Sequence, residues 1–88
     1  MDKPIQRSSD AFAAPLDDTV LLLNAETGRY HGLNPVAARI WDLLADPITQ
    51  DALVAKLLTE FEVSQQECQE QVAVFLDALR ERGLLKQG

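Results

Sequence analysis

The apolar residues of this chain change their spacing once, near Asn34. Before that point they occur in short runs at residues 11–16 and 19–23, and a further short segment, 29–33, follows a loop that ends in Gly28. Short apolar runs separated by turn-forming residues predict strands, and the glycine favours a hairpin. From Asn34 onward the apolar residues recur every three or four positions, which predicts helices.

The segment 29–33 runs directly into a helix start. Asn34 offers a side-chain oxygen to the free N–H groups of the next turn, and Pro35 suits the first helical position, where an N–H is not needed. The run 19–23 is continuous rather than alternating, so we expect a strand covered on both faces. Residues 1–10 are polar and lack periodicity, so we expect a flexible lead-in before a single domain over 11–85.

Three helices are expected after Asn34. The first ends before Pro47, and the second begins after the cap residue Thr49. The third has the capping box of Ser64 and Glu67 and stops at Gly83. Their apolar stripes are Val36, Ala37, Ile40, Leu43 and Leu44, with Trp41 at the edge, then Leu53, Leu57, Leu58 and Phe61, then Cys68, Val72, Phe75, Leu76 and Leu79. Two or three strands before three helices predict a small α+β domain.

Composition and charge narrow the possible partners. The 88 residues suffice for one small domain, and 47% of them are apolar. The net charge of −6 disfavours nucleic acids and anionic membranes as partners. The chain has one cysteine, no signal-peptide pattern and no membrane-length apolar run, so we expect a cytoplasmic protein.

No set of residues points to an enzyme. His31 is the only histidine and is expected on a surface or edge strand, because no partner for a general base is evident. Cys68 falls on the apolar stripe of the third helix and is expected to be a buried small side chain. One histidine and one cysteine do not assemble a zinc site of the usual ligands within one chain. We therefore expect no catalytic residues, no metal and no cofactor.

Two binding functions stay open on the pattern alone. A hairpin followed by three helices is compatible with a winged-helix DNA-binding protein, whose third helix would enter the major groove. Residues 64–82, however, carry four acids against two arginines, a net charge of −2. The alternative is that residues 29–33 form an edge strand, whose unpaired backbone groups accept an extended peptide.

The segment Gly28 to Leu44, together with Val72, Phe75, Leu76, Leu79 and the Gly83-Leu84-Leu85 turn, closely resembles the PqqD-like family of peptide-recognition proteins. The resemblance covers residues 18–85. It implies a RiPP recognition element: a three-stranded antiparallel sheet followed by three helices in a winged helix-turn-helix arrangement. Such an element is a non-catalytic adaptor that binds the leader of a ribosomally synthesised precursor peptide and delivers it to a processing enzyme.

Within that family the sequence resembles the lasso-peptide members more than the quinone-cofactor branch. Ala45-Asp46-Pro47 stands where a Cys-Asp-Gly turn is expected in that branch. The implied partners are a leader peptide, a leader-cleaving protease and a macrolactam-forming cyclase. The alternative is a PqqD-type chaperone that presents its precursor to a radical-SAM enzyme.

In the family the leader adds as a strand beside the third strand of the sheet and lies against the third helix. This maps the peptide-binding residues to the strand residues Arg29, Tyr30, His31, Gly32 and Leu33. On the helix we expect one flank, made of Gln65, Gln69, Val72, Ala73 and Leu76, to contact leader side chains. The opposite flank, with Gln71, Val74 and Ala78, stays open as the alternative.

Overall fold

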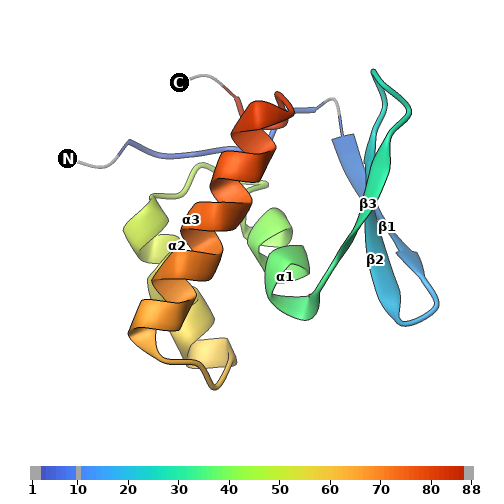
Figure 1. Ribbon diagram of the computed structural model, residues 1–88. Coiled ribbons are helices and arrows are strands. Elements are labelled where there is room, and N and C mark those ends of the chain that lie inside the picture. Colours follow the sequence, from blue (N-terminus) through green and yellow to red (C-terminus); the bar gives the residue numbers. More distant parts are fainter. Residues whose placement is uncertain (1–2, 10, 87–88) are drawn as a thin grey trace.

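Three strands precede three helices in the structure, a computed structural model that describes residues 3–9 and 11–86. Strands β1 (Ala11–Leu16), β2 (Thr19–Asn24) and β3 (Tyr30–Leu33) form one antiparallel sheet in the order β1-β2-β3. Helices α1 (Pro35–Leu43), α2 (Gln50–Glu60) and α3 (Gln65–Glu81) lie to one side of the sheet, with α3 packed against α1 and α2 (Figure 1). The expected α+β class with three antiparallel strands and three helices is confirmed.

The helices begin and end where their capping residues predict. Each expected cap side chain accepts a hydrogen bond from the backbone N–H three residues later: Asn34 from Ala37, Thr49 from Ala52 and Ser64 from Glu67, at 2.8 to 3.1 Å. Helix α3 closes at Gly83, which has a φ of +70°, and the Leu84 N–H donates to the Leu79 carbonyl at 2.9 Å. Within residues 3–9 and 11–86, no helix is both long and apolar enough to cross a membrane.

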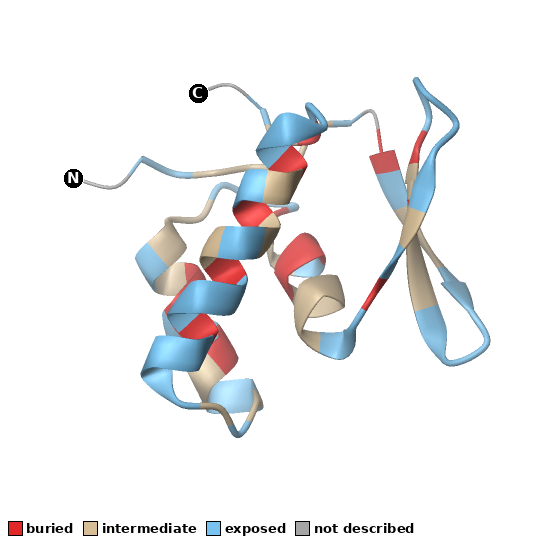
Figure 2. Ribbon diagram, in the orientation of Figure 1, coloured by how far each residue is buried: buried red, intermediate tan, exposed pale blue. Residues whose placement is uncertain are grey.

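The core lies where the three helices meet the inner face of the sheet. Figure 2 shows the buried positions of α3 gathered on the side turned toward α1 and α2. The largest fully buried side chains are Trp41, Ile40, Leu44, Leu53, Leu57, Leu76, Leu79, Leu84, Val72 and Cys68. Trp41, which we expected at the edge of the α1 stripe, is only 1% exposed. A large aromatic ring at the centre of so small a core supplies much of its apolar area.

The sheet is covered on one face only. Leu22 and Leu33 point into the core, whereas Phe12, Leu23 and Tyr30 stand opposite one another across the strands on the outer face. On that face Phe12 is 52% and Tyr30 68% exposed. The prediction of a strand covered on both faces was therefore wrong, because the helices all pack on the same side.

The N-terminal segment is attached to the domain rather than free. Ile5 exchanges backbone hydrogen bonds with Ile48 at 2.7 and 2.9 Å, and the Arg7 N–H donates to the Leu44 carbonyl at 2.9 Å. The Arg7 guanidinium also stands 5.2 Å from the centre of the Trp41 ring. The expected flexible lead-in does not hold for residues 5–8, since Ile5 packs on the core; residues 1, 2 and 10 lie outside the described part.

Candidate functional site

Strand β3 leaves one edge of the sheet unpaired in the part of the chain that the structure describes. The Asn24 N–H donates to the Arg29 carbonyl at 2.8 Å. This bond fixes which residues along β3 direct their backbone N–H and C=O groups toward β2 and which direct them outward. Residues 29, 31 and 33 therefore direct their backbone groups toward β2, and Tyr30 and Gly32 direct theirs outward. Two N–H donors and two carbonyl acceptors are thus available to an added strand.

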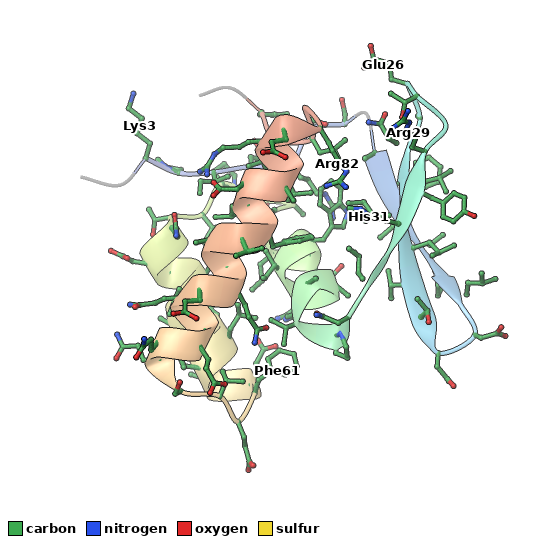
Figure 3. All side chains as sticks on the ribbon, in the orientation of Figure 1. Lys3, Glu26, Arg29, His31, Phe61 and Arg82 are labelled. Atoms are coloured by element: carbon green, nitrogen blue, oxygen red, sulfur yellow. The ribbon has the colours of Figure 1, made fainter. Side chains whose placement is uncertain are left out.

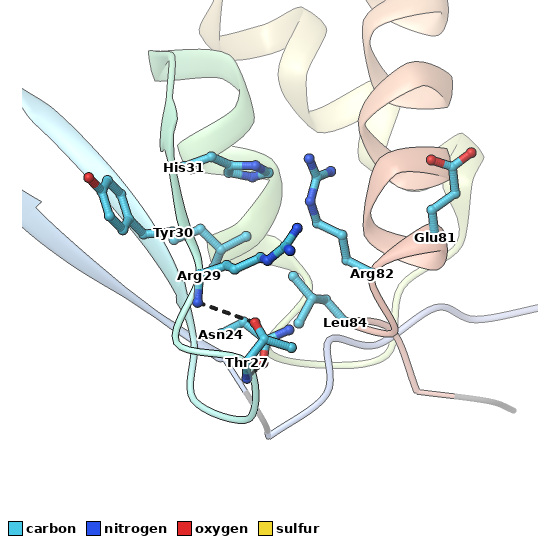
Figure 4. Close-up of a pocket in the computed structure, with 9 residues that line it drawn as sticks. Asn24, Thr27, Arg29, Tyr30, His31, Glu81, Arg82 and Leu84 are labelled. Carbon is cyan, nitrogen blue, oxygen red and sulfur yellow. Dashed lines mark hydrogen bonds between the residues drawn. The ribbon is translucent and has the colours of Figure 1, made fainter.

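The side chains of β3 alternate between the inner face of the sheet, which meets the helices, and its outer face. His31 is half-buried, and its ring points toward α3, while Leu33 is 6% exposed and belongs to the core (Figure 3). Tyr30 points away to the outer face (Figure 4). Gly32 keeps the regular register of the ladder, opposite Leu21 of β2. The predicted strand residues therefore divide into backbone donors and acceptors (30 and 32) and inward-facing side chains (31 and 33).

The α3 residues predicted to contact a peptide do not line either of the two hollows described next. Val72 and Leu76 are 0% exposed and belong to the core, so their side chains have no surface to offer. Gln65 and Gln69 are exposed and Ala73 is half-buried, but they line neither of the two hollows described next. The structure therefore corrects the prediction for Val72 and Leu76, whose side chains pack in the core, whereas contact of Gln65, Gln69 and Ala73 with a peptide stays a prediction.

An apolar hollow of about 490 Å³ lies between α1 and the opposite flank of α3. Its walls are Val36, Ala37 and Ile40 from α1 and Glu70, Gln71, Val74, Phe75 and Ala78 from α3. Val74 is 70% exposed, although it is apolar. The hollow also includes Asn34, the residue that follows β3, so it adjoins one end of the free edge.

A second hollow, of about 690 Å³, lies at the other end of β3, and we refer to it as the cationic hollow. Arg29 and His31 enter it from the strand side and Arg82 from the end of α3. Figure 4 shows these three side chains pointing toward one another, whereas Glu81, which also lines the hollow, points away. The cationic hollow therefore presents positive charge in a chain whose net charge is −6.

The environment of His31 keeps its imidazole neutral near pH 7. Partial burial lowers the pKa of His31, and the positive charge of Arg82 lowers it further. Arg29 and Arg82 form no ion pair within residues 3–9 and 11–86. Arg29, His31 and Arg82 thus bring two guanidinium groups and one neutral ring to the hollow, all able to donate hydrogen bonds. The hollow is also lined by the polar side chains of Asn24, Thr27, Tyr30 and Glu81.

Cys68 has the structural role that its position on the stripe predicted. It is 1% exposed, and its Sγ lies 3.8 Å from the Val54 carbonyl oxygen in the α2–α3 contact. Burial raises the pKa of the thiol, which keeps it protonated. In the described residues no three metal-ligating side chains gather into a cluster.

Residues that line the hollows but were not among the predicted site residues include Phe75 on α3, Arg82 at its C-terminal cap, and Val36 and Ala37 on α1. One signal was available: Val74 is an apolar residue that falls off the core stripe. An apolar side chain on the exposed side of an otherwise polar helix face indicates a contact surface. The position of Arg82 beside His31 had no sequence signal, because the two residues are 51 positions apart and meet only through the fold.

The chain was compared with known proteins over its whole length. No curated protein matches the chain. Among solved structures it is similar to one described as "TbiB1 in Complex with the TbiA(beta) Leader Peptide", with 32% identity, a TM-score of 0.79 and coverage of 94% of this chain and 96% of the other. It is also similar to "Lasso peptide synthetase B1 complexed with the leader peptide", with 25% identity, a TM-score of 0.78 and coverage of 94% and 98%.

The family comparison matches almost the same residues as the domain that the strands and helices build. The model for coenzyme PQQ synthesis protein D matches residues 19–85, from the start of β2 to the residue after Leu84. That range includes the free edge of β3 and both walls of the two hollows. This chain belongs to the PqqD family.

Proposed function

We propose that this protein is a non-catalytic adaptor that binds the leader of a ribosomally synthesised precursor peptide and delivers it to a processing enzyme. The observation that carries the proposal is the free edge of β3, which runs beside two hollows lined by α3. Both similar structures described above are complexes with a leader peptide, which supports the same role here.

The backbone of the leader pairs with Tyr30 and Gly32. An added strand forms up to four main-chain hydrogen bonds there, each contributing about 0.5–1.5 kcal/mol net. These bonds depend little on leader sequence, so side chains must supply the selectivity. With one or two apolar anchors offsetting the ordering of the peptide, we expect a dissociation constant between about 10 nM and 10 μM.

The apolar anchor lies between α1 and α3. A leader side chain packs over Val74 and Ala78 on one side and Val36 on the other, next to the ring of Phe75. This surface replaces the flank around Ala73 that the sequence analysis preferred. A peptide strand at β3 reaches it without rearrangement of the core, because the hollow is already open.

We propose two partner enzymes, the leader-cleaving protease and the cyclase of a lasso-peptide system. The similar structure described as a lasso peptide synthetase B1 supports this choice over a radical-SAM enzyme. The reaction would then be carried out by these cytoplasmic partners and not by this chain. His31 lies in the cationic hollow and Cys68 in the core, so they do not form a base and nucleophile pair.

A winged-helix DNA-binding function is not favoured by the surface of α3. The helix ends in Arg80 and Arg82, but Arg80 pairs with Asp77 at 3.1 Å, and acids occupy the first turns. A helix that enters the major groove needs cationic side chains free to contact phosphates and base edges. Arg82 instead points toward β3 (Figure 3).

The deciding experiment is fluorescence anisotropy of a labelled leader peptide, taken from the precursor encoded next to this protein, titrated with the protein. A labelled DNA duplex at low salt is the control. We expect saturable binding of the leader and none of the duplex. Binding of DNA alone would favour a transcriptional regulator, and binding of neither probe would refute leader recognition by the isolated chain.

A further inference from the structure

The cationic hollow is the feature that leader binding through backbone and apolar contacts does not use. It brings together Arg29, His31 and Arg82 from elements that are distant in sequence. Two guanidinium groups that face a shared space repel one another and lack a carboxylate partner within the described residues. A bound anion removes that repulsion.

Arg29 and His31 are held by the sheet so that both face the same side. They are two residues apart, and alternation along the strand places them on the face turned toward α3. The Arg29 N–H donates to the Thr27 Oγ at 3.2 Å, which fixes the approach of the hairpin (Figure 4). Across the hollow, one guanidinium nitrogen of Arg82 lies 3.4 Å from the Ala78 carbonyl oxygen, which leaves its other N–H groups directed into the space.

The cationic hollow lies beside β3, so its position indicates which part of a bound peptide can enter it. Any strand added to the edge at Tyr30 and Gly32 directs alternate side chains toward α3, on the face that His31 occupies. A side chain next to His31 on that face enters the hollow between Arg29 and Arg82. We propose that the hollow binds the carboxylate of an aspartate or glutamate in the peptide segment that pairs with β3; this inference rests on the proposed function.

The geometry also gives the position of that acidic residue in the peptide. Along α3, Arg82 lies seven or eight residues beyond Val74 and Phe75, a distance of about 11 Å at 1.5 Å per residue. An extended strand covers this distance in three to four residues, and only an even spacing returns to the same face. The acidic residue therefore lies four positions from the residue that fills the apolar hollow.

The bound carboxylate accepts charge-assisted hydrogen bonds from the two guanidinium groups and a hydrogen bond from the neutral imidazole of His31. Such bonds are shorter and stronger than those between neutral groups, and a planar guanidinium can offer two donors to one carboxylate. Glu81 does not compete for these donors, because its side chain points away from them (Figure 4). The site thus favours leaders that place an acid at this position.

The test combines a scan of the leader with a charge change in the protein. Each aspartate and glutamate of the labelled leader from the neighbouring precursor is replaced by its amide, one at a time, and affinity is measured by anisotropy. Arg82→Gln removes the hollow's charge on α3. Arg80→Gln is the matched control, since it removes the same charge from the same helix but lies against Asp77, outside the hollow.

We expect one amide substitution in the leader, and Arg82→Gln in the protein, each to weaken binding about tenfold at low salt, which corresponds to about 1.4 kcal/mol. Combined, they should cost little more than either alone, because they remove the same interaction. Arg80→Gln should leave the affinity unchanged. Binding that is insensitive to every amide substitution, or equal losses from Arg82→Gln with the acidic and amide peptides, would overturn the inference while leaving leader recognition intact. Absence of binding by any peptide would instead refute the proposed function.

Discussion

Replacing Gly32 by proline tests strand addition at β3 with little disturbance of the fold. The Gly32 N–H points away from β2, so proline removes a donor that the sheet does not use. The preceding residue, His31, is already in an extended strand, which is the conformation that a following proline requires. The pyrrolidine ring also occupies the space that the leader carbonyl would take.

The magnitude follows from the hydrogen bond that is lost. Removing one partner and leaving a desolvated carbonyl of the peptide without a donor costs about 1–3 kcal/mol, which is about a 5- to 150-fold loss of affinity. Gly32→Ala is the control, because it keeps the N–H and its added Cβ meets the Thr19 methyl at an ordinary 3.5 Å. The alanine variant should bind like the original protein.

The assay pairs leader anisotropy with thermal unfolding of the same samples. We expect Gly32→Pro and Gly32→Ala to melt at similar temperatures while only the proline variant loses affinity. His31→Pro completes the set: its N–H faces β2, so this variant should lose stability as well as binding. Equal leader affinity for Gly32→Pro and Gly32→Ala would refute pairing of the leader at this edge. A marked loss of stability in Gly32→Pro, but not in Gly32→Ala, would show that the Gly32 N–H is directed toward β2 and not outward.

Three further predictions address the helices and His31. Ala78→Glu should weaken leader binding at least about tenfold by placing a charge in the apolar hollow, whereas Ala73→Glu, with the same charge change on the other flank, should not; the reverse order in the anisotropy titration would restore the flank that the sequence favoured. Leu76→Ala should lower the free energy of unfolding by about 2–5 kcal/mol in urea titration, and an unchanged midpoint would contradict its burial. Since burial and Arg82 lower the pKa of His31 in the folded state, the unfolded chain binds the proton more readily, so stability should fall as pH drops below about 6.5. His31→Gln should reduce that fall, and identical stability profiles for the variant and the original protein would argue against it.

The local chemistry of the sequence determined the elements and their ends. The cap residues Asn34, Thr49 and Ser64 each lead a helix, because their side-chain oxygens satisfy N–H groups within the next turn. The short apolar runs became strands, and Gly83 ended α3 with a positive φ. These features depend only on neighbours along the chain, so residue type and spacing suffice to predict them.

Only the tertiary structure decided which surface of each element is free. Residues 72 and 76 share the α3 stripe with Cys68, and whether a position on that stripe meets α2, the core or solvent depends on the packing of three helices. The same holds for Val74 and Ala78, whose access to a hollow requires α1 on the other side. Periodicity identifies an apolar stripe on a helix, but it does not show how much of that stripe the neighbouring helices bury.

The cationic hollow is the clearest case of a feature that the fold creates. Arg29 and His31 were identified from the strand, but Arg82 was counted only as one of the two arginines of residues 64–82. The chain leaves β3 through α1 and α2, and α3 then brings its C-terminal end back beside β3 (Figure 1). The sequence by itself therefore determined the secondary structure, the family resemblance and the edge strand, whereas the contacts between distant residues that form the two hollows came from tertiary packing.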